Sequence, residues 1–155
     1  MSYVVRGLDP TPFQPLFGLS DQELAERGVI RMTVTEKPSF PCRVSLTDRD
    51  IGERVLLLNH VSHDVANPYR ASHAIFVTES GEPAAEYIDE VPPVFGPRIL
   101  SLRGFDKDGM MAEAVIAQPG EADPAIRKLF ANDVVQTIHV HNASRGCFAA
   151  KVERN

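Results

Sequence analysis

Two apolar runs flank an Asp-Gly pair in RILSLRGFDKDGMMAEAVIAQ, residues 98–118. Asp108-Gly109 is typical of a tight turn between antiparallel strands, because both residue types tolerate a positive φ. The runs on either side, 98–105 and 110–118, are rich in aliphatic residues and predict the two strands of a hairpin. We therefore expect an antiparallel sheet in this part of the chain.

Other short apolar segments extend this pattern along the chain. They are separated by turn-forming residues, and they predict further strands at 29–35, 43–46, 54–59 and 73–78. The last segment, 136–153, predicts a second hairpin. Alternating strand and helix units are missing, which argues against a parallel, doubly wound sheet. By contrast, the three prolines of residues 9–18 predict no regular element there.

Two short helices complete the expected fold. One follows a capping box formed by Ser20 and Glu23 and ends near Gly28. The other begins with Asp123 as its N-cap and Pro124 as its first helical residue. We expect an α+β fold in which six to eight short strands form a mainly antiparallel sheet, able to curl toward a barrel, with two short helices.

Composition narrows the function classes. The 155 residues predict one domain over 1–155, and 43% hydrophobic with 24% charged residues is typical of a soluble protein. A net charge of -5 argues against a general nucleic-acid binder, and we expect no membrane span or secretory leader. Cys42 and Cys147 are too few for a disulfide scaffold, so reduced thiols in a cytoplasm are expected.

The terminal hairpin carries the sharpest chemical hypothesis. In a strand, alternate residues share a face, so His139 and His141 point to the side opposite their apolar neighbours. A three-residue loop with Gly146 in its bulge position pairs His141 with Cys147 and His139 with Ala149. This register places two imidazoles and a thiol close together on one face.

Three interpretations of this cluster stay open. The nitrogen and sulfur atoms of His139, His141 and Cys147 suit zinc, which needs further ligands. Those ligands would come from the set formed by His60, His63, His73 and Cys42. Alternatively, His141 activates the Cys147 thiol as a nucleophile. In the third interpretation, the three residues have only a structural role.

A second candidate region is NPYRASH, residues 67–73, which precedes an apolar strand. Arg70 offers a planar guanidinium for a carboxylate or phosphate, and Tyr69 offers a ring for stacking. A surface turn whose arginine pairs with an acidic residue is the alternative. Ser72 and His73 are neighbours that point to opposite faces, so they form a poor pair of nucleophile and base.

The chain also resembles a known family. The segments PCRVSL (41–46), PYRASHAIFV (68–77), RILSLRGFDKDGMM (98–111) and IHVHNASRGCFAAKVER (138–154) carry the likeness. They are similar to the uncharacterised bacterial family named domain of unknown function 1203 (DUF1203). The resemblance implies a bacterial, cytoplasmic, single-domain protein. No activity, cofactor or catalytic residue follows from it.

These observations lead to three hypotheses of function. The first is a small cytoplasmic domain that binds a small anionic ligand through a pocket lined by Tyr69, Arg70, His73, His139, His141 and Cys147. The second is a metal-assisted or thiol-dependent enzyme centred on His141 and Cys147. The third is a non-catalytic homodimer that associates through an exposed strand edge. The identity of any cofactor stays unknown from the sequence.

Overall fold

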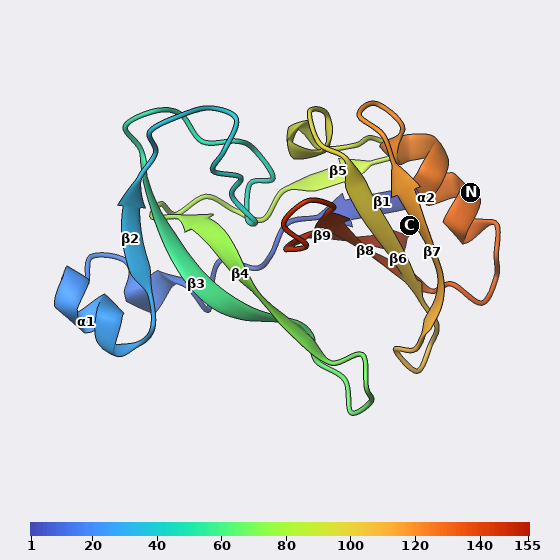
Figure 1. Ribbon diagram of the computed structural model, residues 1–155, viewed down its shortest axis with the longest axis horizontal. Coiled ribbons are helices and arrows are strands. Elements are labelled where there is room, and N and C mark those ends of the chain that lie inside the picture. The colour runs from blue at the N-terminus through green and yellow to red at the C-terminus, as the bar shows by residue number, and fades with distance from the viewer.

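A computed structural model describes residues 1–155 and contains two antiparallel sheets (Figure 1). The larger sheet has six strands in the order β5-β1-β9-β8-β6-β7, and the smaller has three in the order β2-β3-β4. The strands are β1 (Tyr3–Arg6), β2 (Ile30–Thr33), β3 (Arg54–His63), β4 (Ala71–Thr78), β5 (Glu86–Ile88), β6 (Leu100–Phe105), β7 (Met111–Ala117), β8 (Thr137–Asn142) and β9 (Phe148–Arg154). The helices are α1 (Asp21–Glu26) and α2 (Ala122–Phe130), with 3-10 turns at Gln14–Leu16 and Pro93–Phe95.

This architecture confirms the expected α+β class with antiparallel strands and two short helices. The nine strands exceed the expected six to eight, and neither sheet closes into a barrel. The Asp-Gly turn joins β6 to β7 as predicted, with Gly109 at a φ of 77°. Neither helix has the length and hydropathy needed to cross a lipid bilayer.

The larger sheet buries one face against α2. Ile126, Leu129 and Phe130 form the inward stripe of α2, and all three are buried as the sequence predicts. They pack with alternate residues of the strands, among them Leu102 on β6 and Val140 on β8. Because side chains alternate along a strand, the intervening residues of β6 and β8 lie on the opposite face. That opposite face carries the histidines.

The smaller sheet forms a second core with α1. Ser20 and Glu23 make the predicted capping box, since the Ser20 hydroxyl accepts from the Glu23 N–H and the Glu23 carboxylate accepts from the Ser20 N–H. Leu24 of α1 is fully buried with Leu56 and Ile75 of β3 and β4. The sheet thereby holds a helix of only six residues, which would be unstable alone.

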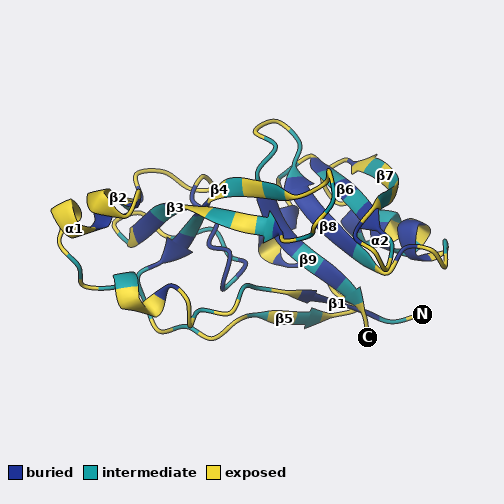
Figure 2. Ribbon diagram, turned by 90° about the horizontal axis from the view of Figure 1, so that it is seen from below, coloured by how far each residue is buried: buried dark blue, intermediate teal, exposed yellow.

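The β3–β4 hairpin links the two sheets. It extends from the smaller sheet toward the larger one (Figures 1 and 2), and its end contacts the β6–β7 turn. The His63 Nε2–H donates to the carbonyl of Gly109 at 2.9 Å, and Asn67 Nδ2 donates to the carbonyl of Asp108 at 3.0 Å. The hairpin therefore covers part of the histidine face.

Three local predictions are wrong. Residues 43–46 form a turn rather than a strand, because the Leu46 N–H donates back to the Cys42 carbonyl and Leu46 adopts a φ of 56°. The helix α2 begins one residue before Asp123, whose carboxylate accepts from the Tyr3 hydroxyl at 2.6 Å instead of capping the helix. The proline-rich segment 9–18 contains a 3-10 turn. Finally, β1 was not predicted at all.

Candidate functional site

All five histidines of the chain lie along the seam between the two sheets. His60 and His73 are cross-strand partners on β3 and β4, and His63 follows on β3. The ring of His73 lies 4.8 Å from that of His141, and the ring of His63 lies 4.9 Å from that of His139, measured between centroids. Residues 68 and 76 positions apart thus meet because two hairpins cross.

Hydrogen bonds fix three of these imidazoles. His63 Nε2 and His141 Nδ1 donate to the carbonyls of Gly109 and Gly146, each at 2.9 Å. His73 Nδ1 lies 2.7 Å from the hydroxyl of Ser62. His139 has no hydrogen-bond partner in the protein, although only 4% of it is exposed. Its ring instead packs against the rings of neighbouring residues.

Burial keeps four of the five imidazoles uncharged at neutral pH. Burial, together with the smaller effect of nearby Arg103, lowers the pKa of His139 to about 3 and that of His141 to about 4. The pKa values of His60 and His73 are also lowered, mainly by burial. These four rings therefore supply neutral donors and acceptors rather than positive charge.

The zinc interpretation finds no converging ligand set. Neither histidine pair has a third histidine, cysteine, aspartate or glutamate close enough to bind the same metal ion. His139, His141 and Cys147 do not form the group of ligands that the sequence suggested. A structural site for zinc needs four such ligands, and a catalytic site needs three.

The predicted register of the terminal hairpin is wrong. His141 pairs with Phe148 rather than Cys147, and His139 pairs with Lys151 rather than Ala149. The loop is longer than predicted, and a bulge between β8 and β9 takes up one extra residue. That bulge turns the Phe148 ring toward the histidines and leaves Ala149 in the main core.

Cys147 consequently has different neighbours. Its Sγ accepts from Arg43 Nη2 and from Asn142 Nδ2, each at 3.3 Å. Arg43 is only 2% exposed, and its other donors reach the carbonyls of Phe148 at 2.8 Å and Pro41 at 2.7 Å. No carboxylate forms an ion pair with this guanidinium. Burial lowers the pKa of Arg43, and the Cys147 sulfur acts in the opposite direction.

Arg43 and Cys147 line a cleft of about 1230 Å³ between the two sheets. Its walls come from β4, from Met32 of β2 and Leu57 of β3, and from the segments 36–43 and 97–99 and the β8–β9 turn. Three arginines line it against a single acidic residue, Glu36. Arg98 is neutralised by Asp48 through two hydrogen bonds of 2.6 and 2.9 Å, whereas Arg145 is exposed and has no acidic partner.

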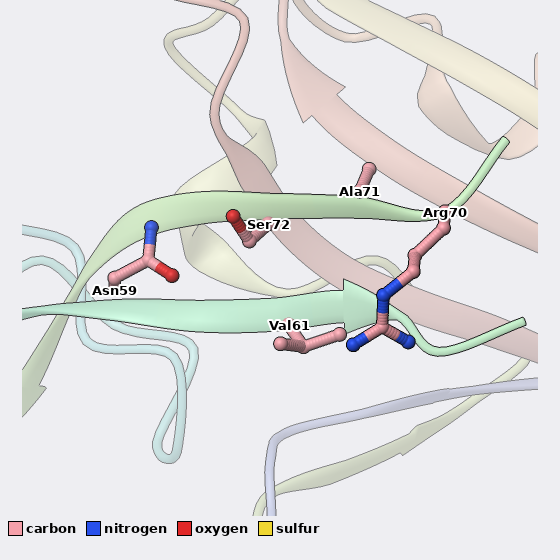
Figure 3. A pocket seen from close by; sticks show the side chains of 5 residues that line it. All are labelled: Asn59, Val61, Arg70, Ala71 and Ser72. Atoms are coloured by element: carbon pink, nitrogen blue, oxygen red, sulfur yellow. The ribbon is translucent and has the colours of Figure 1, made fainter. Parts of the chain in front are cut away.

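The residues predicted from sequence do not form one site. His73 and Cys147 line the cleft, while His139 and His141 are buried and do not line it. Tyr69 and Arg70 lie at the far end of the β3–β4 hairpin, where Tyr69 is 6.3 Å from the Phe105 ring and Arg70 forms an ion pair with Asp64. Arg70 lines a separate hollow of about 250 Å³ at this hairpin, and Figure 3 shows its side chain beside Val61.

Sequence reasoning missed the three arginines of the cleft. Arg43 carried a usable signal, because it is a charged residue within the apolar run CRVSL and had no obvious reason to be there. Arg98 and Arg145 carried no such signal. They reach the cleft because their segments, which are distant from Arg43 and from each other in the sequence, meet there in the fold.

Comparison with known families agrees with this description. The model of the family described as "Protein of unknown function (DUF1203)" matches residues 39–154. The chain belongs to this family. No curated protein and no solved structure matches it. The matched range contains all the residues that line the cleft except Met32, Glu36 and Pro38.

Proposed function

We propose that this DUF1203 protein binds a small anionic ligand in the cleft between β4 and the β8–β9 turn. The observation that carries the proposal is Arg43, a buried guanidinium without a carboxylate partner beside the cleft. Buried charges in proteins are ordinarily paired, because an unpaired charge loses its hydration without compensation. A ligand carboxylate or phosphate near Arg43 would supply the missing negative charge.

The charge distribution supports this proposal. The chain as a whole has a net charge of -5, yet Arg43 and Arg145 lie in one cleft without ion pairs. Positive groups placed together in an acidic protein attract anions locally. The neutral ring of His73 adds a further hydrogen-bonding group. Of the residues predicted from sequence, the proposal keeps His73 and Cys147 as direct ligand contacts and gives His139 and His141 a supporting position.

The location of the protein is part of the proposal. Both cysteines are unpaired, and Cys147 lines a cleft where oxidation could reach it. Unpaired cysteines are typical of reducing compartments. Together with the family resemblance, this supports a bacterial cytoplasmic protein.

A thermal-shift experiment with phosphate, sulfate, succinate and citrate tests the binding proposal. An anion that occupies the cleft should raise the melting temperature, because it binds only the folded state. Arg145→Gln should weaken the binding of that anion about tenfold, which is the effect of losing one charge-assisted hydrogen bond. Arg27→Gln is the matched control, since Arg27 is also exposed and unpaired but lies outside the cleft.

Arg70→Ala separates this proposal from the sequence-based pocket. If the ligand binds through Tyr69 and Arg70, this variant should lose binding. If the ligand binds in the cleft, the variant should retain it. Equal stabilisation of the wild type and Arg145→Gln by every anion would contradict binding in the cleft.

Thiol chemistry at Cys147 is a second candidate function. Two N–H donors contact its sulfur, and the residue lines the cleft, where a reagent can reach it. Here Arg43 and Asn142, rather than His141, are the neighbours of the thiol. Iodoacetamide should alkylate Cys147 much faster than Cys42, which is 1% exposed. Equal rates for the two cysteines in the folded protein, followed by peptide mass spectrometry, would rule this candidate out.

A further inference from the structure

The outer edge of β4 is only partly paired. β4 is the last strand of the smaller sheet, so its far side has no neighbouring strand. The carbonyl of Phe76 accepts from the Arg43 N–H on that side, and the N–H of Thr78 donates to Cys42 Sγ. Because backbone groups alternate along a strand, Ala74 and Ser72 also direct their N–H and C=O groups outward. No protein group pairs with them.

This open stretch of backbone faces the cleft. Ser72, Ala74 and Phe76 all contribute to its wall, and Ser72 and Ala74 are exposed. Cys42 makes a parallel bridge to Phe76, so the segment 41–43 occupies the edge at one end of β4. The edge then stays free over the residues that precede Phe76. A peptide strand of about five residues, roughly 16 Å long, would match the length of residues 71–75.

We propose that the anionic ligand of this cleft is an extended acidic peptide that adds a strand to the edge of β4. The inference rests on the proposed function, and it names the ligand class of the same site. Backbone groups of Ser72 and Ala74 pair with the peptide, and a peptide carboxylate meets Arg145 and Arg43.

Size and charge both favour this ligand. The cleft of about 1230 Å³ exceeds the roughly 300–1,000 Å³ usual for a compact small molecule. Its unpaired charges are positive, so an acidic peptide is favoured over a basic one. A free strand edge supplies directional hydrogen bonds for an extended backbone, which a free inorganic anion cannot use.

Isothermal titration calorimetry with unlabelled synthetic peptides tests the inference on the full chain. The probe is acetyl-Val-Glu-Val-Glu-Val-amide, and the second peptide replaces both glutamates with glutamine. A third peptide is the glutamine sequence with a free C-terminal carboxylate, which distinguishes a terminal carboxylate from side-chain carboxylates. The fourth is the acidic probe with alternate backbone nitrogens methylated along its strand edge. We expect the acidic probe to bind at least tenfold more tightly than the neutral peptide and at least tenfold more tightly than the N-methylated peptide.

Protein variants complete the experiment. Arg145→Gln should weaken the binding of the acidic probe about tenfold, while Arg27→Gln should leave its affinity unchanged. Ala74→Pro removes an outward N–H that makes no internal hydrogen bond, so it should also weaken binding, with the fold checked by circular dichroism. The N-methylated peptide gives the same information if this variant does not fold.

The outcomes separate the inference from the proposed function. Binding of succinate or phosphate without tighter binding of the acidic probe would overturn strand addition and leave anion binding intact. Equal affinity of the methylated and unmethylated probes would do the same. A stable dimer that does not bind the probe would show that a second copy of the chain occupies the β4 edge. This result would overturn the proposal of a peptide ligand. Absence of binding by every anion and every peptide would overturn both proposals.

Discussion

Mild acid should destabilise this protein through its buried histidines. His139 and His141 are 4% and 2% exposed, and burial lowers their pKa values to about 3 and about 4. In the unfolded chain both rings titrate near 6.5. As the pH falls below 6.5, the unfolded state therefore takes up protons that the folded state does not. The free energy of unfolding must decrease over this range.

The size of the effect follows from the two shifts. A pH of 5 is about 1.5 units below the pKa of each imidazole in the unfolded chain, and each unit corresponds to about 1.36 kcal/mol. Each ring thus favours the unfolded state by about 2 kcal/mol, and the pair by about 4 kcal/mol. His60 and His73 act in the same direction, because their pKa values are also lowered.

Urea unfolding between pH 7 and pH 5 at constant ionic strength measures this loss. The carboxylates of Asp89 and Asp123 titrate below this pH window, because folding lowers their already low pKa values further. His139→Phe is the matched variant, because its ring can occupy the same aromatic contacts with Phe105 and Phe148. It should remove about one proton from the uptake on unfolding near pH 5. A free energy of unfolding that stays constant from pH 7 to pH 5 would refute the reasoning, as would an unchanged slope in the variant.

Two further predictions concern the scaffold. Gly7→Ala should lower the free energy of unfolding by about 2–3 kcal/mol, because a Cβ there would overlap the backbone carbonyl of Val44. Gly81→Ala has open space and should be nearly neutral, which chemical denaturation of both variants will show. Ser20→Ala should cost about 1 kcal/mol in the same assay, since it removes the hydroxyl that caps the Glu23 N–H. An unchanged urea midpoint for Ser20→Ala would mean that α1 depends on packing alone.

Local features of the fold could be predicted because their causes are local. The Asp108-Gly109 turn needs only two residues with the right backbone preference, and the capping box of Ser20 and Glu23 spans one helical turn. The apolar stripe of α2 likewise depends on spacing within one segment. By contrast, β1 is four residues long and is stabilised by pairing with the distant strands β5 and β9.

The candidate site depends on long-range contacts that no local pattern encodes. The single bulge of the terminal hairpin changes which residue faces His141, and the sequence offers several places for a bulge near Gly146. The pairing of His73 with His141 requires the β3–β4 hairpin to cross the larger sheet. That crossing is fixed by contacts such as the hydrogen bond of His63 to Gly109, whose partners are 46 residues apart.

The observed contacts also change which residues can attract an anion. A sequence with several histidines near an expected pocket suggests imidazolium groups as the positive charges. Burial makes His139 and His141 neutral at physiological pH, so that role passes to Arg43 and Arg145. Arginine keeps its charge throughout the physiological range, whereas these histidines would gain theirs only in acid that also destabilises the fold. The histidines therefore contribute contacts between the two sheets, and in the proposed function the arginines supply the positive charge that an anionic ligand would meet.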